Sequence, residues 1–470
     1  MAEQHARVIG PQVYAERRNR IREAVGGGLI LWLGHVQQPR NYLANAYPFR
    51  QNSHFLYYTG LAHPELALLS YPERDFDVLF SRPATMDDIV WSGGGADRVE
   101  MARSAGVETV EHTDRLGEYL AQAQKQGLQI HYLPPYQASS LFRLAELLAV
   151  DPTQVTAGKS ERLAEEVAAQ RSVKTDLEIA EIEDALEVTS RMCGLAMAET
   201  RPGLHEHDIA GAIQGVALRH YRQLSFLPIV TVRGEVLHNE SYANLLEDGK
   251  LLLIDAGAES PNYYASDITR TIPINGRFSP AQAAIYSIVL KVQLSAIQAV
   301  KPGISFRDVH LLACKVMIEG LCDAGLIKGN PGDALEAGAH ALFFPHGLGH
   351  MLGLDVHDME DLGDIVGYPK GERRSEQFGL NFLRLTRIMA PGMVVTIEPG
   401  IYFIPALIDK WAQERMHREF INYERLESFR ASGGIRIEDD VLVTDGGARV
   451  LGPAIPKAIA EIEAAMSGGR

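Results

Sequence analysis

Five side chains that can bind metal ions stand far apart in this chain, each within a distinctive local sequence. Each lies beside an apolar run or a glycine turn, where an unpaired charge is costly. Four carboxylates and one imidazole in such places need a counter-charge, and a pair of divalent metal ions would supply it, which suggests a hydrolase. The five are Asp255 in LLLIDAG, Asp267 in SDITRT, His350 in HGLGH, Glu398 in TIEPGIY and Glu438 in GGIRIEDD.

The two aspartates are expected to meet across a pair of strands. Asp255 ends one apolar run, and Asp267 begins what reads as a returning strand. Their like charges would repel unless a cation lay between them. Taken singly, each aspartate is explained more simply as a turn or capping residue.

Three histidines within twelve positions indicate a site, although a single histidine is more often structural. His346 and His350 are four residues apart, and His357 follows seven residues later. The HExxH pattern is absent, which excludes the common zinc-protease interpretation.

The set of ligand types indicates the metal. Oxygen-rich coordination with one imidazole suits Mn²⁺, whereas zinc sites are often rich in thiolate. Two such ions, about 3.5 Å apart, could share a hydroxide and polarise a carbonyl.

Glu438 allows two interpretations from its local pattern. Ile435 and Ile437 alternate with Arg436 and Glu438, which predicts a half-buried strand. A solvent-facing glutamate paired with Arg436 fits that pattern as well as a metal ligand does.

The pattern of apolar runs and helical stretches changes along the chain and indicates two domains, residues 1–170 and 171–470. The first ~165 residues alternate apolar runs with helical stretches, typical of a small α/β domain. Its expected strands are Leu29–Leu33, Ala67–Ser70, Val78–Phe80 and Gln129–Leu133. A helix then begins after Thr175, where TDLE forms a capping box.

The second domain is expected to be α+β, with an antiparallel sheet flanked by helices. Its expected strands are Ile229–Val232, Leu251–Ile254, Val394–Ile397 and Val441–Val443. Its expected helices are Pro280–Val300, Phe306–Ala324 and Lys457–Met466. Two segments, Arg384–Pro399 and Leu407–Ala431, are expected to be surface insertions with helical content.

Composition excludes several classes of protein. The 470 residues are 46% hydrophobic and carry a net charge of −15, which argues against nucleic acid as a partner. No apolar stretch approaches the roughly 20 residues of a membrane span, and the N-terminus lacks a signal-peptide core. Three cysteines, Cys193, Cys314 and Cys322, are too few for a disulfide framework. We therefore expect a cytoplasmic protein with buried free thiols.

Taken jointly, the motifs resemble those of a known family. IDAG, SDITRT, PHGLGH, DVHD, IEPGIYF and GGIRIEDD are similar to motifs of the pita-bread metallopeptidases that cleave X–Pro bonds, aminopeptidase P and prolidase. Residues 47–60, YPFRQNSHFLYYTG, resemble that family's N-terminal domain. The resemblance covers nearly the whole chain. It implies an α+β fold, a duplicated pita-bread catalytic domain preceded by an α/β N-terminal domain, and homo-oligomers (dimers or tetramers) that pair through the N-terminal domain.

The resemblance also implies roles for the five opening residues. Asp255, Asp267, His350, Glu398 and Glu438 would bind two divalent ions, Mn²⁺ in the first place with Co²⁺ or Zn²⁺ as alternatives. Asp267 and Glu438 would bridge the ions, and Glu398 would also act as general base on the bridging water.

Residues around the ligands receive roles in the same way. His357 would stabilise the oxyanion of the tetrahedral intermediate. His238, in VLHNE, would lie near the substrate proline, with His346 in the same pocket and Arg436 behind the ligands. Arg384 lies fourteen residues before Glu398, at the position of the prolidase arginine that binds the free carboxylate of a dipeptide. A surface arginine on a helix is the plainer alternative.

An X–Pro dipeptidase of the prolidase type is therefore expected. The alternative is aminopeptidase P, which removes the N-terminal residue from longer X–Pro peptides, because residues 47–60 are closer to the bacterial form of that enzyme. A non-catalytic binding protein or a metal-free, creatinase-like hydrolase fits less well, since all five ligands are present.

One departure from the family pattern concerns spacing. Asp255 and Asp267 are twelve residues apart, where the family usually has eleven. An extra residue in the turn at 259–264 would leave both ligands in place, whereas a strand shifted by one position would turn Asp267 away. We expect the extra residue in the turn, because the flanking motifs are intact.

Overall fold

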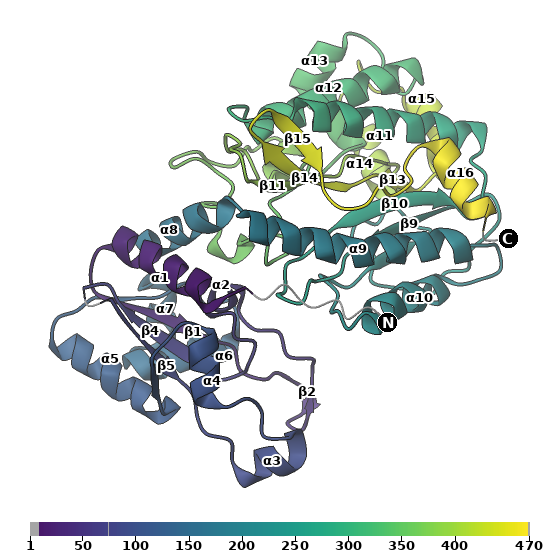
Figure 1. The fold of residues 1–470 in the computed structure, drawn as a ribbon. Helices are drawn as coiled ribbons and strands as arrows, with labels where there is room; N and C mark the ends of the chain where they lie inside the picture. Colours follow the sequence, from purple (N-terminus) through teal and green to yellow (C-terminus); the bar gives the residue numbers. More distant parts are fainter. Residues whose placement is uncertain (1–8, 74, 469–470) are drawn as a thin grey trace. The chain divides into compact units, whose positions relative to one another are not determined.

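A computed structural model of the chain describes residues 9–73 and 75–468. The chain divides into two compact units (Figure 1). The first comprises the described residues up to Arg171 together with Met359–Val366, and the second comprises Ser172–Asp358 and the described residues from Gly367 onward. Across these residues, no helix is both long and apolar enough to cross a membrane.

The first unit is built on a mixed five-stranded sheet in the order β6-β5-β4-β1-β7. Neighbouring strands pair antiparallel in the centre and parallel at both edges. The strands are β1 (Leu29–Leu33), β4 (Ala67–Tyr71), β5 (Phe76–Phe80), β6 (Thr109–Glu111) and β7 (Ile130–His131), with a separate hairpin of β2 (Pro39–Tyr42) and β3 (Asn45–Ala46). The α/β expectation for this part is confirmed, although β7 is shorter than the expected Gln129–Leu133.

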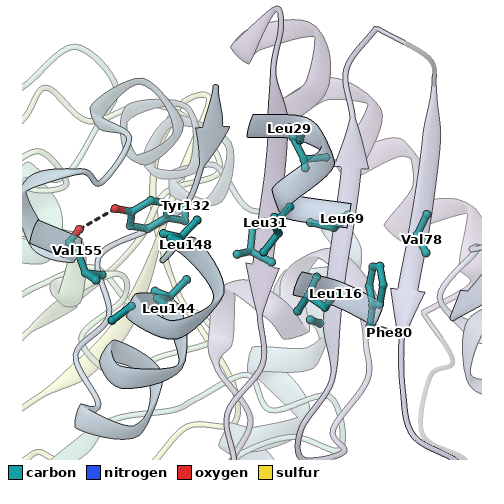
Figure 2. Close-up of a cluster of buried hydrophobic side chains, with 14 residues drawn as sticks. Leu29, Leu31, Leu69, Val78, Phe80, Leu116, Tyr132, Leu144, Leu148 and Val155 are labelled. Carbon is teal, nitrogen blue, oxygen red and sulfur yellow. Dashed lines mark hydrogen bonds between the residues drawn. The ribbon is translucent and has the colours of Figure 1, made fainter. Parts of the chain in front are cut away.

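The core of this unit forms where apolar strand residues meet the helices beside them. Leu31, Leu69 and Phe80 of the sheet are fully or almost fully buried, and Figure 2 shows them with side chains of neighbouring helices. Burying such a side chain stabilises the fold by about 1.5–3 kcal/mol. The phenol of Tyr132 donates a 2.9 Å hydrogen bond to the carbonyl oxygen of Val155, which satisfies its polar end inside this core (Figure 2).

Several helices of the N-terminal part contact the strands of this sheet. A buried ion pair fixes the first of them, since Arg18 donates from Nε to the Asp77 carboxylate at 2.7 Å and Arg22 reaches the same carboxylate at 2.7 Å. The helices are α1 (Pro11–Val25), α2 (Ser53–Thr59), α3 (Met86–Ser92), α4 (Arg98–Ser104), α5 (Leu116–Lys125), α6 (Ala138–Leu148), α7 (Pro152–Ala157) and α8 (Glu161–Ser172).

The second unit consists of two halves with the same order of elements, a packed helix pair followed by antiparallel strands. In the first half, α9 (Asp176–Glu199) and α10 (Glu206–Arg219) precede β8 (Ile229–Thr231), β9 (Leu251–Ala256) and β10 (Ile268–Pro273). The capping box expected at Thr175 is present, with Thr175 accepting from the Glu178 amide. Figure 1 shows α9 beside β9 and β10.

In the second half, α11 (Pro280–Ala299) and α12 (Phe306–Asp323) pack together before the remaining strands. Helix α11 contacts β11, β12, β13 and β15. The strands are β11 (Val394–Ile397), β12 (Gly400–Tyr402), β13 (Gly434–Arg436), β14 (Asp439–Thr444) and β15 (Gly447–Val450). The remaining α-helices are α13 (Pro331–Ala337), α14 (Pro405–Glu414), α15 (Tyr423–Leu426) and α16 (Ile459–Ser467).

Three expectations for this unit were wrong. The strands form three small antiparallel sheets, β10-β9-β8, β11-β14-β15 and β12-β13, where a single sheet was expected. The segment Arg384–Pro399 contains no helix, although the strand expected within it at Val394–Ile397 is present as β11 and pairs with β14. The strand Gly434–Arg436 is buried on both faces, where a half-buried strand was expected. The helical content of Leu407–Ala431 is confirmed.

Candidate metal centre

The hairpin of β9 and β10 brings the two aspartates to one face. Asp255 pairs with Thr269, and the same register continues without a shift to the bridge between Glu259 and Ala265. Side chains two residues apart on a strand share a face, so Asp267 lies on the same face as Thr269 and Asp255. The extra residue between the aspartates is therefore accommodated in the turn, as expected, and the strand is not shifted.

His350 reaches the cluster because its segment runs alongside β11. Its amide donates to Thr396 Oγ1 at 3.1 Å, and the Thr396 amide donates back to the His350 carbonyl at 2.9 Å. A Cβ at Gly349 would lie 2.0 Å from the carbonyl oxygen of Thr396, so only glycine permits this approach. This contact explains the second glycine of HGLGH.

The His350 ring is oriented by its other nitrogen. Nδ1 lies 3.1 Å from the carbonyl oxygen of Met351, and donation to that oxygen leaves Nε2 with a free lone pair. Nε2 lies 3.5 Å from both Asp267 Oδ2 and Glu398 Oε1. Burial first, and then the neighbouring His357, hold the pKa of His350 well below its usual value. The imidazole is therefore neutral, as a metal ligand must be.

Glu438 comes from the second half of the unit and is joined to the first half by hydrogen bonds. Its amide donates to the Thr269 carbonyl at 3.0 Å, and the Thr269 hydroxyl donates to Glu438 Oε2 at 2.6 Å. Arg436 does not pair with Glu438. It donates to Asp255 Oδ2 at 2.6 Å and to Thr269 Oγ1 at 3.1 Å. Glu438 is 2% exposed, which rules out a solvent-facing glutamate.

The carboxylates are crowded, and two of their buried oxygens lack a donor among the residues that the structure describes. Asp267, His350 and Glu438 can each present a ligand atom within 4.8 Å of the others. Burial, reinforced by the charges of Glu438 and Asp255, raises the pKa of Asp267 well above its usual value. Within the described part of the chain, Asp255 Oδ1 and Asp267 Oδ1 are buried without a hydrogen-bond partner. Orphaned carboxylate oxygens in this number fit a cation between them.

Glu398 lies at the same cluster with more access to solvent. Thr396 Oγ1 donates to its Oε1 at 3.3 Å, and its amide donates to the Leu348 carbonyl at 2.8 Å. Burial raises the pKa of Glu398 to about 7, although the positive charge of Arg436 opposes the shift.

A chain of hydrogen bonds fixes His346 near Glu398. Arg436 Nη1 donates to the Tyr402 hydroxyl at 3.1 Å, and that hydroxyl lies 2.8 Å from His346 Nε2. His346 Nδ1 lies 2.8 Å from the Gly347 carbonyl oxygen, so the hydroxyl donates to Nε2 and the ring is neutral. Burial lowers the pKa of His346 to about 3.

The three remaining candidates border the cluster. The ring of His357 lies 4.1 Å from that of His350, measured between centroids. His238 is exposed, and partial burial of its ring together with the charges of Arg436 and Arg384 lowers its pKa. Arg384 is half-buried and does not lie on a helix, and its positive charge contributes to lowering the pKa of His346.

Several residues in contact with the ligands were not singled out from the sequence. Thr269 lies within SDITRT and Tyr402 within IEPGIYF, yet a hydroxyl in a motif gives no sign of its partner. Asp440, the last residue of GGIRIEDD, accepts from the Asp267 amide at 3.0 Å. Burial raises its pKa well above the usual range. Two acidic residues in succession at the start of a buried strand are the one signal that could have identified it.

Comparison with known proteins identifies the family. The pattern of metallopeptidase family M24 matches residues 180–445, more than half of the chain, and that of the aminopeptidase P N-terminal domain matches residues 14–131. The chain belongs to metallopeptidase family M24. The M24 assignment makes it a hydrolase that uses divalent metal ions, with an aminopeptidase P-type N-terminal domain before a pita-bread domain. The expected fold and family are confirmed.

Individual relatives of this M24 chain extend over nearly its full length. It is 31% identical to the human Xaa-Pro dipeptidase over 98% of this chain and 93% of the relative. It is 33% identical to a probable Xaa-Pro aminopeptidase of Fusarium vanettenii over 89% of this chain and 88% of the relative. Among solved structures, Pseudomonas aeruginosa aminopeptidase PepP superposes with a TM-score of 0.81 at 29% identity. The match covers 98% of this chain and 99% of that structure's chain. Zinc-substituted E. coli aminopeptidase P in complex with product gives 0.80 at 30% identity, with the same coverage.

Proposed function

We propose that this chain hydrolyses the X–Pro peptide bond as a dipeptidase of the prolidase type. The observation that carries the proposal is that the positive charge of Arg384 acts on Glu398 and His346 of the buried carboxylate and imidazole cluster. The human Xaa-Pro dipeptidase, similar along nearly the whole chain, supports the same choice.

The cluster would hold two divalent ions, and we propose Mn²⁺ as the native metal. The residues that would hold the ions are Asp255, Asp267, His350, Glu398 and Glu438. Bound ions would supply Lewis-acid polarisation and a water of lowered pKa. Activity of metal-free protein restored with Mn²⁺, Co²⁺ or Zn²⁺ in turn tests this choice, and stronger restoration by Zn²⁺ than by Mn²⁺ would overturn it.

The chain's own groups would then handle protons and position the substrate. Glu398 would accept the proton of the attacking water at a carboxylate oxygen. His357, beside the His350 ring, would donate to the developing oxyanion. His238, at the exposed edge, would contact the substrate proline, and His346 would line the same pocket. Arg436 would keep the Asp255 carboxylate in position through its hydrogen bond to that group.

Arg384 would select dipeptides by binding the carboxylate that follows proline. A guanidinium binds a carboxylate through two parallel hydrogen bonds, and such charged hydrogen bonds contribute about 1.5–3 kcal/mol each. In an X–Pro–Y peptide that carboxylate is replaced by a neutral amide, so the same interaction is absent.

The test is Arg384→Ala assayed on one X–Pro dipeptide and its X–Pro–Y extension. We expect KM for the dipeptide to rise by roughly 100-fold or more, and KM for the tripeptide by less than about threefold. Arg373→Ala is a matched control, because this exposed arginine lies in the same segment. Equal effects on both peptides would refute the carboxylate role.

Aminopeptidase P activity is the second candidate, favoured by the N-terminal domain at residues 14–131 and by the two solved structures described above. It predicts that the X–Pro–Y peptide is the better substrate of the unaltered enzyme. The paired assay therefore distinguishes the two activities.

We also propose two domains at residues 1–170 and 171–470, a homodimer or tetramer paired through the first domain, and a cytoplasmic location. Light scattering of the full chain and of a Ser172–Arg470 fragment tests the assembly. A monomeric full chain would refute it. Cell fractionation tests the location.

A further inference from the structure

A second cluster of metal-binding side chains lies in the same unit and shares no residue with the carboxylate cluster. His310 and Cys314 are four residues apart on α12, hence on one face of that helix. His340 comes from the short 3₁₀ helix η2 (Ala339–Leu342). The three can each present a ligand atom within 4.8 Å of the others, and the Cys314 Sγ lies 3.4 Å from His310 Nε2. All three are at most 1% exposed.

This cluster leaves polar atoms without partners. Within the described residues, both ring nitrogens of His340 and Nδ1 of His310 are buried with no hydrogen bond. A buried polar group without a partner costs about 1–3 kcal/mol. The contact between Cys314 and His310 Nε2 satisfies one of the four ring nitrogens, so a thiol–imidazole hydrogen bond does not account for His340.

The two imidazoles are in the state that binds a metal ion, whereas burial raises the pKa of the Cys314 thiol, so this group must lose its proton when an ion binds. Burial lowers the pKa of His310 to about 3 and that of His340 to about 4, so both imidazoles are neutral and carry a lone pair. The charged or titratable groups that also influence them are Arg307, His346 and His417.

We propose that His310, Cys314 and His340 form a buried site for a transition-metal ion that favours thiolate and imidazole, Zn²⁺ or Cu⁺. Around one tetrahedral zinc ion, sulfur and nitrogen ligand atoms lie roughly 3.4–3.6 Å apart, which the 3.4 Å contact already matches. On binding, the Cys314 S–H bond breaks, a sulfur–metal bond forms and the proton leaves to solvent. Thiolate and imidazole are the ligands that select these ions over Mn²⁺.

The site is structural in character because it is closed to solvent. The ring of Phe344 lies 5.5 Å from the His310 ring and 4.7 Å from the His346 ring, between centroids. An ion there would link α12 to η2, which ends four residues before His346.

Cobalt substitution tests the proposal without relying on activity. The protein is produced in Co²⁺ medium so that the ion enters during folding. A thiolate ligand gives Co²⁺ an intense charge-transfer band in the near ultraviolet, whereas the carboxylate cluster contains no sulfur. We expect this band in the unaltered protein and its loss in Cys314→Ser. Cys322→Ser, on the same helix, is the matched control and keeps the band.

Further variants separate this site from the carboxylate cluster. Glu438→Gln disables the carboxylate cluster and is expected to keep the band, with close to one ion of Zn²⁺ or Cu⁺ per chain when isolated from cells. Metal analysis of that variant identifies which of the two ions is bound. His340→Gln is expected to lose the ion and the band. A folded, unaltered protein without the band, or a band that survives Cys314→Ser, would overturn the proposal and leave the proposed peptidase function untouched.

Discussion

The close approach of Gly349 to β11 offers the sharpest test of how the site is built. An added Cβ would lie 2.0 Å from the Thr396 carbonyl oxygen, and ordinary contact begins at 3.4 Å, so the two backbones must separate by about 1.4 Å. That shift breaks the pair of hydrogen bonds between His350 and Thr396. Metal–ligand distances tolerate about 0.2 Å, so His350 would no longer reach the ions held by the carboxylates.

We therefore expect Gly349→Ala to lose at least about 100-fold in kcat/KM, since a misplacement of about 1 Å costs that much. Overpacking of the buried strand pair is expected to reduce the free energy of unfolding by about 1–3 kcal/mol. The assay measures X–Pro dipeptide hydrolysis across a Mn²⁺ titration, with a thermal melt of the same preparation.

Gly347→Ala is the matched control in the same motif. Its Cβ would meet Leu383 Cα at 3.2 Å, a contact relieved by a few tenths of an ångström. We expect it to keep kcat within about threefold. Unchanged Mn²⁺ affinity and turnover in a folded Gly349→Ala protein would refute the argument that this backbone contact positions the ligand.

Three further predictions follow from other contacts. Glu398→Gln is expected to abolish turnover at saturating Mn²⁺, because an amide cannot accept the proton; near-normal turnover would refute its role as base. Arg436→Lys removes the fork that binds Asp255, so metal affinity should fall by about 10- to 100-fold; unchanged affinity by calorimetry would count against it. Asp77→Asn leaves Arg18 buried without its partner, and the unfolding free energy should fall by about 3–5 kcal/mol. Burial would raise the pKa of Asp77, but the arginines outweigh it and lower the pKa, so this stabilisation is present above about pH 4 and is lost on acidification. Melting curves should therefore separate wild type from Asp77→Asn at neutral pH and approach each other as the pH falls below about 4; curves that stay equally far apart would refute the ion-pair argument.

Local sequence was sufficient wherever the physical cause is local. The capping box at Thr175 fixed the start of α9, because its hydrogen bonds join residues three apart. The apolar run Leu29–Leu33 forms β1 with the expected bounds, since continuous burial suits a central strand. The five candidate ligands could be predicted from the sequence because each is a charged or imidazole residue beside an apolar run or a glycine turn.

The tertiary structure decided what depends on partners distant in the sequence. The strand Gly434–Arg436 looked half-buried from its alternation, but its polar face is covered by β10, where Thr269 and Thr271 accept or donate hydrogen bonds. The stretch Arg384–Pro399 was expected to have helical content, yet it contains no helix and keeps the strand expected at Val394–Ile397, which pairs with β14. At Gly434–Arg436 the polar positions are satisfied by hydrogen bonds that local periodicity does not encode.

The sequence by itself determined the ligand chemistry: four carboxylates and an imidazole, each beside an apolar strand or a glycine turn. Only the tertiary structure decided which atoms meet. Register across β9 and β10 settled the face of Asp267, the contact at Gly349 set the reach of His350, and Thr269 joined the two halves at Glu438. The same holds for His310, Cys314 and His340, because burial and the absence of partners are properties of packing and not of spacing.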